Sequence, residues 1–304
     1  MSNGFSYIVQ QGANAVQLGG FYVLLASSYV IVHGAIRRFN LAFGAVAAWA
    51  GTMTTGMAIA LFDRVFWPPA AILAAGLAVG MLCGALAAQA VAVFAVAPIR
   101  NAPRLSVMVA TLGAAIALEE GMRIATGNEA VWMPPGLLPA ALTGTFDLAD
   151  GISVSRPGAL SFLAALAVAA SLALYMRKSR FGRLWQANAE DPQMAELLGV
   201  DTRRVFLLSS VIAGFAAAVT GVLIVLRYGN MNFYDGFMIN AKALFVAVLG
   251  GLGSFGGIFV AGMALALFET GWSAFAPLLY RDVAVFTVLV ALLALRHNSR
   301  SDRP

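Results

Sequence analysis

The sequence predicts an all-α integral membrane protein: a bundle of 8–9 transmembrane helices with a broken or re-entrant glycine-rich segment. Hydrophobic residues make up 61% of the 304 residues and charged residues only 11%, whereas soluble domains carry about 25% charged residues. A soluble chain of this length could not bury that much apolar surface. The apolar residues also form long runs, several of which approach the roughly 20 residues that cross a bilayer. We therefore treat residues 1–304 as a single transmembrane domain.

Nine apolar runs are candidate spans. They cover residues 13–32, 41–62, 70–97, 105–121, 159–176, 205–226, 241–249, 257–275 and 283–295. The seventh run is too short to cross a bilayer alone and ends in glycines, which predicts a re-entrant or broken helix. The pattern is compatible with eight crossings and with nine.

Small residues recur every four positions in the third run, at Gly76, Gly80, Gly84 and Ala88. Such a ladder lets two helices approach closely in lipid, where packing rather than the hydrophobic effect drives association. We expect this ladder to be structural.

The basic residues predict an orientation. With nine crossings, 13 of the 19 Lys and Arg residues lie on the side of a polar segment, residues 177–204, and 6 lie on the other side. Cytoplasmic loops carry the excess of Lys and Arg, so we expect this segment and the C-terminus in the cytoplasm and the N-terminus outside.

The same rule explains the net charge of +5 without a nucleic-acid partner. Residues 1–12 carry no basic residue, so we expect the first span to be retained.

The longest loop predicted outside the cytoplasm covers residues 122–158. It is rich in prolines and charges and therefore should not span the membrane. It is either an exposed connector or a docking surface for an external partner.

The polar segment 177–204 contains a short helix whose ends the residues define. Asp191 can accept hydrogen bonds as N-cap, Pro192 suits the first helical position, and Gly199 suits the left-handed residue that closes a helix. The apolar residues of this helix share one face: Met194, Leu197 and Leu198. A two-turn helix is marginal alone in water, so we interpret it as a helix that docks into a groove of another protein.

No catalytic arrangement is evident. The two histidines, His33 and His297, and the single Cys83 exclude a His/Cys metal cluster. Ser254 in GLGSFGG has Leu252 where a hydrolase nucleophile turn requires glycine. The P-loop motif Gly-Lys-Ser/Thr is also absent. Any ATP hydrolysis that drives this protein must therefore occur on another chain.

Two irregular segments and a few acidic residues interrupt the apolar runs. GAIRRFNLAFG (residues 34–44) and GGLGSFGG (residues 250–257) are either broken helices that bind substrate or tight cytoplasmic turns. Glu269 lies within an apolar run, where a carboxylate usually faces a cavity or an ion partner. Glu119 and Glu120 lie near Arg123 and can reach the interface instead.

These residues together resemble the LivH-type permease subunit of branched-chain amino-acid ABC importers, over nearly the whole chain. The polar segment is similar to the cytoplasmic coupling segment of that family, which binds the ATPase subunit. The matching coupling residues are Gly182, Arg183, Ala189, Glu190, Asp191, Met194, Ala195, Leu197, Leu198 and Gly199. Residues 242–262 are similar to the glycine-rich segment of the family, and residues 34–44 resemble its Asn-Phe-Ala-His-Gly motif.

The resemblance implies a substrate pathway formed by Asn40, Phe43, Gly44, Gly250, Gly251, Gly253, Ser254 and Glu269. Phe43 stands where the family usually has histidine, and Arg37 and Arg38 replace small or apolar residues. The solute is thus a branched-chain amino acid or one of the other solutes of the family, which are urea, short amides and aromatic acids.

The resemblance also implies partners: a second, LivM-like permease subunit, two cytoplasmic ATP-binding subunits and a periplasmic solute-binding protein. It places the chain in the bacterial inner membrane, within the lipid bilayer, and implies no cofactor. The alternative is an ion-coupled secondary transporter or channel acting without an ATPase, in which Glu269, Lys242 and Glu119 would be relay groups. A membrane enzyme and a structural scaffold are weaker alternatives.

Overall fold

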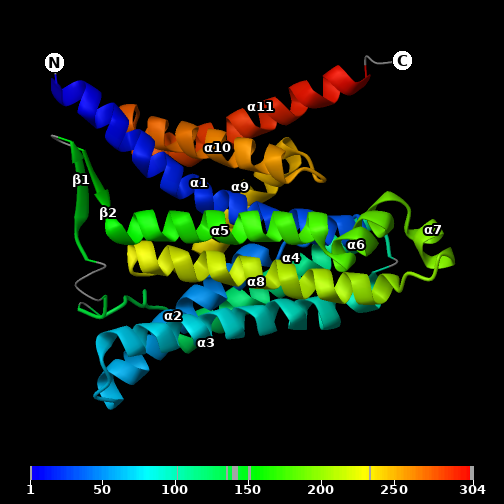
Figure 1. Ribbon diagram of the computed structural model, residues 1–304, viewed down its shortest axis with the longest axis horizontal. Coiled ribbons are helices and arrows are strands. Elements are labelled where there is room, and N and C mark those ends of the chain that lie inside the picture. The colour runs from blue at the N-terminus through cyan, green and yellow to red at the C-terminus, as the bar shows by residue number, and fades with distance from the viewer. Residues whose placement is uncertain are drawn as a thin grey trace.

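The computed structural model describes residues 2–100, 102–134, 136–138, 143–149, 152–232 and 234–301. These residues form an elongated bundle whose helices run roughly along one axis (Figure 1). The long helices are α1 (Ser2–Ile36), α2 (Phe43–Arg64), α3 (Pro69–Ala90), α4 (Arg104–Ala125), α5 (Arg156–Lys178), α8 (Thr202–Tyr228), α9 (Asp235–Gly250), α10 (Phe255–Phe275) and α11 (Arg281–Ser301). The predicted all-α membrane bundle is confirmed.

Eight of the described helices are long and apolar enough to cross a membrane. They correspond to every predicted span except residues 241–249. That run belongs to α9, whose 16 residues extend about 24 Å at 1.5 Å per residue, less than the roughly 30 Å of hydrocarbon in a bilayer. Helix α10 follows α9 after a short turn. In Figure 1, the beginning of α1 and the end of α11 lie at opposite ends of the bundle.

Short elements mark the two ends of the bundle (Figure 1). One end, the α6 end, carries α6 (Arg180–Glu190) and α7 (Pro192–Leu197). The other, the hairpin end, carries the antiparallel strands β1 (Thr145–Ala149) and β2 (Ile152–Ser155). Three further short segments are π-helical η1 (Val91–Val96) and the 3₁₀ turns η2 (Ala97–Ile99) and η3 (Leu278–Tyr280).

The proline-rich loop 122–158 contributes to the hairpin end, although residues 135, 139–142 and 150–151 lie outside the described residues. The Gln10 side chain of α1 bonds both backbone groups of Ser153, as donor at 2.7 Å and as acceptor at 2.9 Å. The Met133 amide donates to the Gly229 carbonyl at 2.8 Å, and Leu137 is buried against α2 and α3. The described part of this loop therefore packs over the ends of helices.

The central helix is α1, which packs against α5, α8, α9 and α10. Nearly every residue from Phe21 to Val32 is buried. This part of α1 is surrounded by protein on all sides. In α11, by contrast, most of the described side chains are exposed. The interior of the bundle is therefore filled by the side chains of α1 rather than by a channel.

The glycine ladder of α3 packs as predicted. A Cβ atom added at Gly80 would lie 1.9 Å from Thr54 Oγ1 and 2.6 Å from the Ala50 carbonyl oxygen of α2. One added at Gly84 would lie 2.6 Å from Ala218 Cβ of α8. The ladder thus lets α3 contact α2 and α8 at backbone distance.

We expect Gly80→Val to destabilise the bundle by about 1–3 kcal/mol or more, because the side chain must displace backbone as well as Thr54. The matched control is Gly113→Val, since a Cβ at Gly113 meets nothing within 4 Å. Thermal unfolding in detergent measures both. Equal unfolding temperatures for the two variants would contradict the close α2–α3 contact.

Candidate functional site

Helix α6 is fastened to the end of α1. The indole of Trp185 donates to the Ile31 carbonyl at 2.7 Å, and the Asn188 amide donates to the Ala35 carbonyl at 2.7 Å. These donors satisfy carbonyl groups in the last turns of α1, which lack partners within the helix or share them. In return, Arg37 donates to the carbonyls of Ala189, at 2.8 Å, and Glu190 at the end of α6.

The packing at this joint is tight. A Cβ atom at Gly34 would lie 2.1 Å from the Trp185 ring, and one at Gly182 would lie 1.9 Å from the Met176 carbonyl oxygen. Ser179 caps α6 by accepting from the Gly182 amide at 2.9 Å. The segment from α5 into α6 is thus a fixed turn held on α1.

Helix α7 projects beyond this joint (Figure 1). Asp191 caps it as predicted, accepting from the amides of Gln193 at 2.9 Å and Met194 at 3.1 Å, and Gly199 has the left-handed φ of 85°. Ala195 faces the chain and is buried. The exposed fractions of the other apolar residues are 53% for Met194, 82% for Leu197 and 76% for Leu198.

The break between α1 and α2 is held from α9 by Asn240, a buried residue that the sequence analysis did not single out. Its Oδ1 accepts from the Gly44 amide at 2.8 Å and from the Tyr29 hydroxyl, and its Nδ2 donates to the Leu41 carbonyl at 2.9 Å. The Phe43 ring packs edge-on against Tyr29 at 5.4 Å. Irregular backbone here is therefore satisfied by protein.

The predicted pathway residues Asn40, Phe43 and Gly44 all lie at this break and are buried. The Asn40 side chain accepts from the Ala42 amide at 3.0 Å. In the described structure, these three residues line the joint between α1, α2 and α9.

The glycine-rich turn between α9 and α10 holds four other predicted pathway residues: Gly250, Gly251, Gly253 and Ser254. Gly251 has φ 94°, and Ser254 caps α10 by accepting from the Gly257 amide at 3.1 Å. Two cavities of about 480 Å³ and 620 Å³ open beside this turn. Both are lined by Trp185, Gln186 and Gly253.

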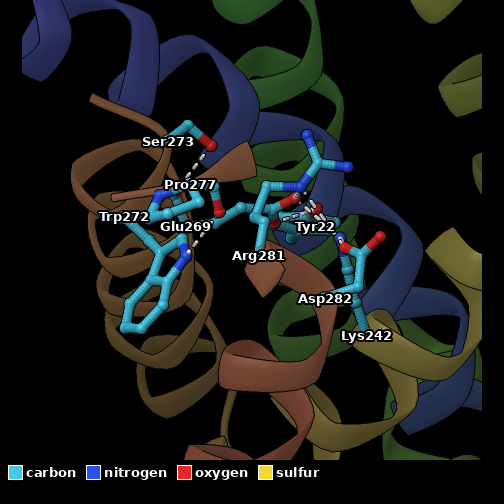
Figure 2. Close-up of polar contacts among 8 residues, drawn as sticks. All are labelled: Tyr22, Lys242, Glu269, Trp272, Ser273, Pro277, Arg281 and Asp282. Carbon is cyan, nitrogen blue, oxygen red and sulfur yellow. Dashed lines mark hydrogen bonds and ion pairs between the residues drawn. The ribbon is translucent and has the colours of Figure 1, made fainter. Parts of the chain in front are cut away.

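Glu269 lies in a different place, within an ionic cluster in which Glu269 and Lys242 are buried and Arg281 and Asp282 are partly exposed (Figure 2). One carboxylate oxygen lies 2.6 Å from Lys242 Nζ and the other accepts from the Tyr22 hydroxyl at 2.6 Å. Lys242 also pairs with Asp282 at 2.9 Å, and Arg281 lies 3.3 Å from Asp282 and 3.5 Å from Glu269. Two cations and two anions thus balance, and they join α1, α9, α10 and α11.

The structure therefore separates the predicted pathway residues into three groups. Glu269 is 14 residues from the start of α10, or about 21 Å of helix axis, whereas Ser254 immediately precedes that helix. The coupling residues, in contrast, lie together on α6, α7 and their connections. Sequence reasoning missed α6 as a helix and missed its contacts with α1, although Trp185 and Asn188 stand out as large or polar residues in a predicted loop.

Among the described residues, no group of three or more His, Cys, Asp or Glu side chains could hold a metal ion. The chain thus combines a multi-pass helical bundle with a short exposed helix, α7, at one end of the bundle.

The chain belongs to the family described as the permease component of branched-chain amino acid transport systems, whose model matches residues 13–293. It is 32% identical to the high-affinity branched-chain amino acid transport system permease protein LivH of Escherichia coli (strain K12), over 100% of this chain and 98% of that protein.

It is 31% identical to the corresponding protein BraD of Pseudomonas aeruginosa, over 98% of this chain and 97% of that protein. A galactofuranose transporter permease, YtfT of Escherichia coli, is 28% identical over 88% of this chain and 74% of its own length. No solved structure matches the chain.

The ionic cluster yields a prediction about stability. Lys242→Met leaves two buried or half-buried carboxylates facing only Arg281, and we expect a loss of about 3–5 kcal/mol, the usual effect of removing one partner of a buried pair. The double variant Lys242→Met/Glu269→Gln restores charge balance and should recover much of this loss. Unfolding in detergent measures the cycle, and strict additivity of the two substitutions would refute the pairing.

Proposed function

We propose that this chain is the permease subunit of an importer that moves branched-chain amino acids, or a related amide, urea or aromatic acid, into the cytoplasm. Its relatives are named as permeases of branched-chain amino acid transport systems, which supports this class of solute. Energy comes from ATP hydrolysed by two separate cytoplasmic subunits. The observation that carries the proposal is the exposed apolar face of α7 on a firmly fixed α6.

The apolar face of α7 is suited to a groove on an ATPase subunit. Leu197 and Leu198 are more than three quarters exposed, whereas a stable two-turn helix needs an apolar contact. Glu196, which accepts from Thr202 at 2.8 Å, ties α7 to the start of α8 and fixes its direction. A displacement of α7 would thus be transmitted to α6, α8 and the end of α1.

The basic residues support an orientation with the α6 end in the cytoplasm of the bacterial inner membrane and the N-terminus outside. The hairpin end would then face the periplasm, where a solute-binding protein could dock. We propose this role for the surface around β1 and β2, which lies at the opposite end from α7 (Figure 1).

The packed interior supports a second permease subunit, of the LivM type. In the described residues, α1 fills the centre of the bundle, so a solute crossing within one subunit would have to separate packed helices. A route between two subunits requires no such rearrangement. We place the cytoplasmic mouth of this route at the cavities beside Gly253 and Ser254, and we propose that Asn40, Phe43 and Gly44 shape it through the joint of α1 and α2.

The ion-coupled alternative requires relay groups that can exchange protons. Glu269 and Lys242 are 4% exposed each and contact one another. The positive and negative charges of their cluster balance. Such a cluster is better suited to holding helices together than to relaying protons.

We expect Leu197→Asp or Gly199→Pro to abolish ATP-coupled uptake while the protein still inserts. The first places a charge in the apolar contact, and the second cannot adopt φ 85°. The matched control is Gln193→Asp, which adds the same charge near the start of α7 but outside its apolar face. Uptake into proteoliposomes containing the ATPase measures the effect, and normal uptake by either variant would count against coupling through α7.

Gly253→Leu should slow uptake severalfold without changing the unfolding temperature. A Cβ at this position meets nothing within 4 Å, so the added side chain occupies the cavities rather than straining the fold. Gly56→Leu, at another position without close neighbours, serves as control on α2. If both variants transport at the rate of the unmodified protein, the mouth of the route lies elsewhere.

A further inference from the structure

Two cavities at the α6 end are lined by arginines and have Arg100 in common. The first, of about 410 Å³, is lined by Arg37, Arg38 and Arg100. The second, of about 360 Å³, is lined by Arg100 and Arg203. Both cavities also reach Phe206. We call these four arginines the basic rim.

Carboxylates do not neutralise the basic rim. Arg37 and Arg38 donate to backbone carbonyls, those of Ala189 and Ala102 among them. Among the described residues, the guanidinium groups of Arg100 and Arg203 form neither an ion pair nor a hydrogen bond. One acidic residue, Glu196, lines the first cavity, and it accepts from Thr202. The rim therefore keeps an excess of positive charge.

Two residues of the rim lie at the ends of candidate membrane spans, where lipid headgroups are expected. Arg100 directly follows the candidate span Pro69–Ile99, and Arg203 is the second residue of the span Thr202–Tyr228. Basic residues at span ends meet the phosphates of the bilayer surface.

The second cavity is also amphipathic. Besides Arg100 and Arg203, the cavity is lined by Val93, Ala97, Pro98 and Phe206, and the side chain of Val93 is exposed. A ligand that fits has an anionic head and an apolar tail.

We propose that the basic rim binds the headgroup phosphate of an anionic phospholipid, with an acyl chain along η1. Basic pockets between transmembrane helices are known to hold such headgroups. The rim adjoins Gln193 and Glu196 of α7, so the bound lipid would brace the coupling helix against the bilayer. Carboxylate side chains of an ATPase subunit are the competing ligand for these arginines. They would make no favourable contact with the apolar wall of the second cavity, whereas an acyl chain would.

The test measures lipid binding to the purified full-length chain in detergent by native mass spectrometry. Phosphatidylglycerol is titrated against the unmodified protein and against Arg100→Ala/Arg203→Ala. We expect roughly thirtyfold weaker binding in the variant, since each arginine near a bilayer surface contributes roughly fivefold. Arg100→Lys/Arg203→Lys should retain most of the affinity, because the charge stays.

The control is Arg177→Ala/Arg180→Ala, which removes two exposed charges at the same end but lines neither cavity. It should bind phosphatidylglycerol like the unmodified protein. An equal loss in this control would overturn the proposal, as would equally tight binding of phosphatidylcholine.

Two further outcomes would assign the rim to another ligand and refute the lipid. Displacement of phosphatidylglycerol by millimolar inorganic phosphate would indicate a site for small anions. Loss of ATPase capture by Arg100→Ala/Arg203→Ala, with lipid binding unchanged, would indicate a protein contact. Unfolding temperatures of all variants show that each result concerns a folded protein.

Discussion

The exchange of hydrogen bonds between the end of α1 and helix α6 is the contact that fixes the position of α6 and, through it, of α7. Trp185 and Asn188 donate to the last carbonyls of α1, and Arg37 donates to the last carbonyls of α6. The Ala35, Ala189 and Glu190 carbonyls lie at helix C-termini and lack an intrahelical partner, whereas the Ile31 carbonyl, about a turn earlier, shares its acceptor oxygen. The close approach requires glycine at position 34, because any side chain would overlap the indole of Trp185.

Polar contacts also hold helices together at two other places inside the bundle. Apolar side chains gain little by leaving lipid for protein, so small residues and polar contacts must hold helices together. Asn240 satisfies the backbone where α1 breaks before α2. The cluster of Lys242, Glu269, Asp282 and Arg281 joins α11, most of whose described side chains are exposed, to the helices of the core. The break between α1 and α2 and the attachment of α11 are therefore each stabilised by a separate set of polar contacts.

Local signals made much of this structure predictable. Run length and composition located eight spans, four-residue spacing located the α3 ladder, and Asp191 and Gly199 located the ends of α7. Contacts between distant residues left no such signal. Glu269 was expected to face a cavity or an ion partner, but the sequence did not identify that partner as Lys242, 27 residues away; its place in a pathway stays a prediction. The cap that Ser254 forms on α10 is a local contact, but nothing in the sequence distinguishes a capping serine from a substrate-binding one.

The position of α1 explains how a short exposed helix could govern transport. Because α6 is fixed to α1, and α1 contacts α5, α8, α9 and α10, a displacement of α7 cannot stay local. Close-packed interiors transmit strain instead of absorbing it, so the core helices would move together as one body. In the proposed importer, a route between two such bodies would open and close as they rotate against each other. The chain therefore needs a stiff core and a well-anchored coupling helix more than it needs a channel of its own.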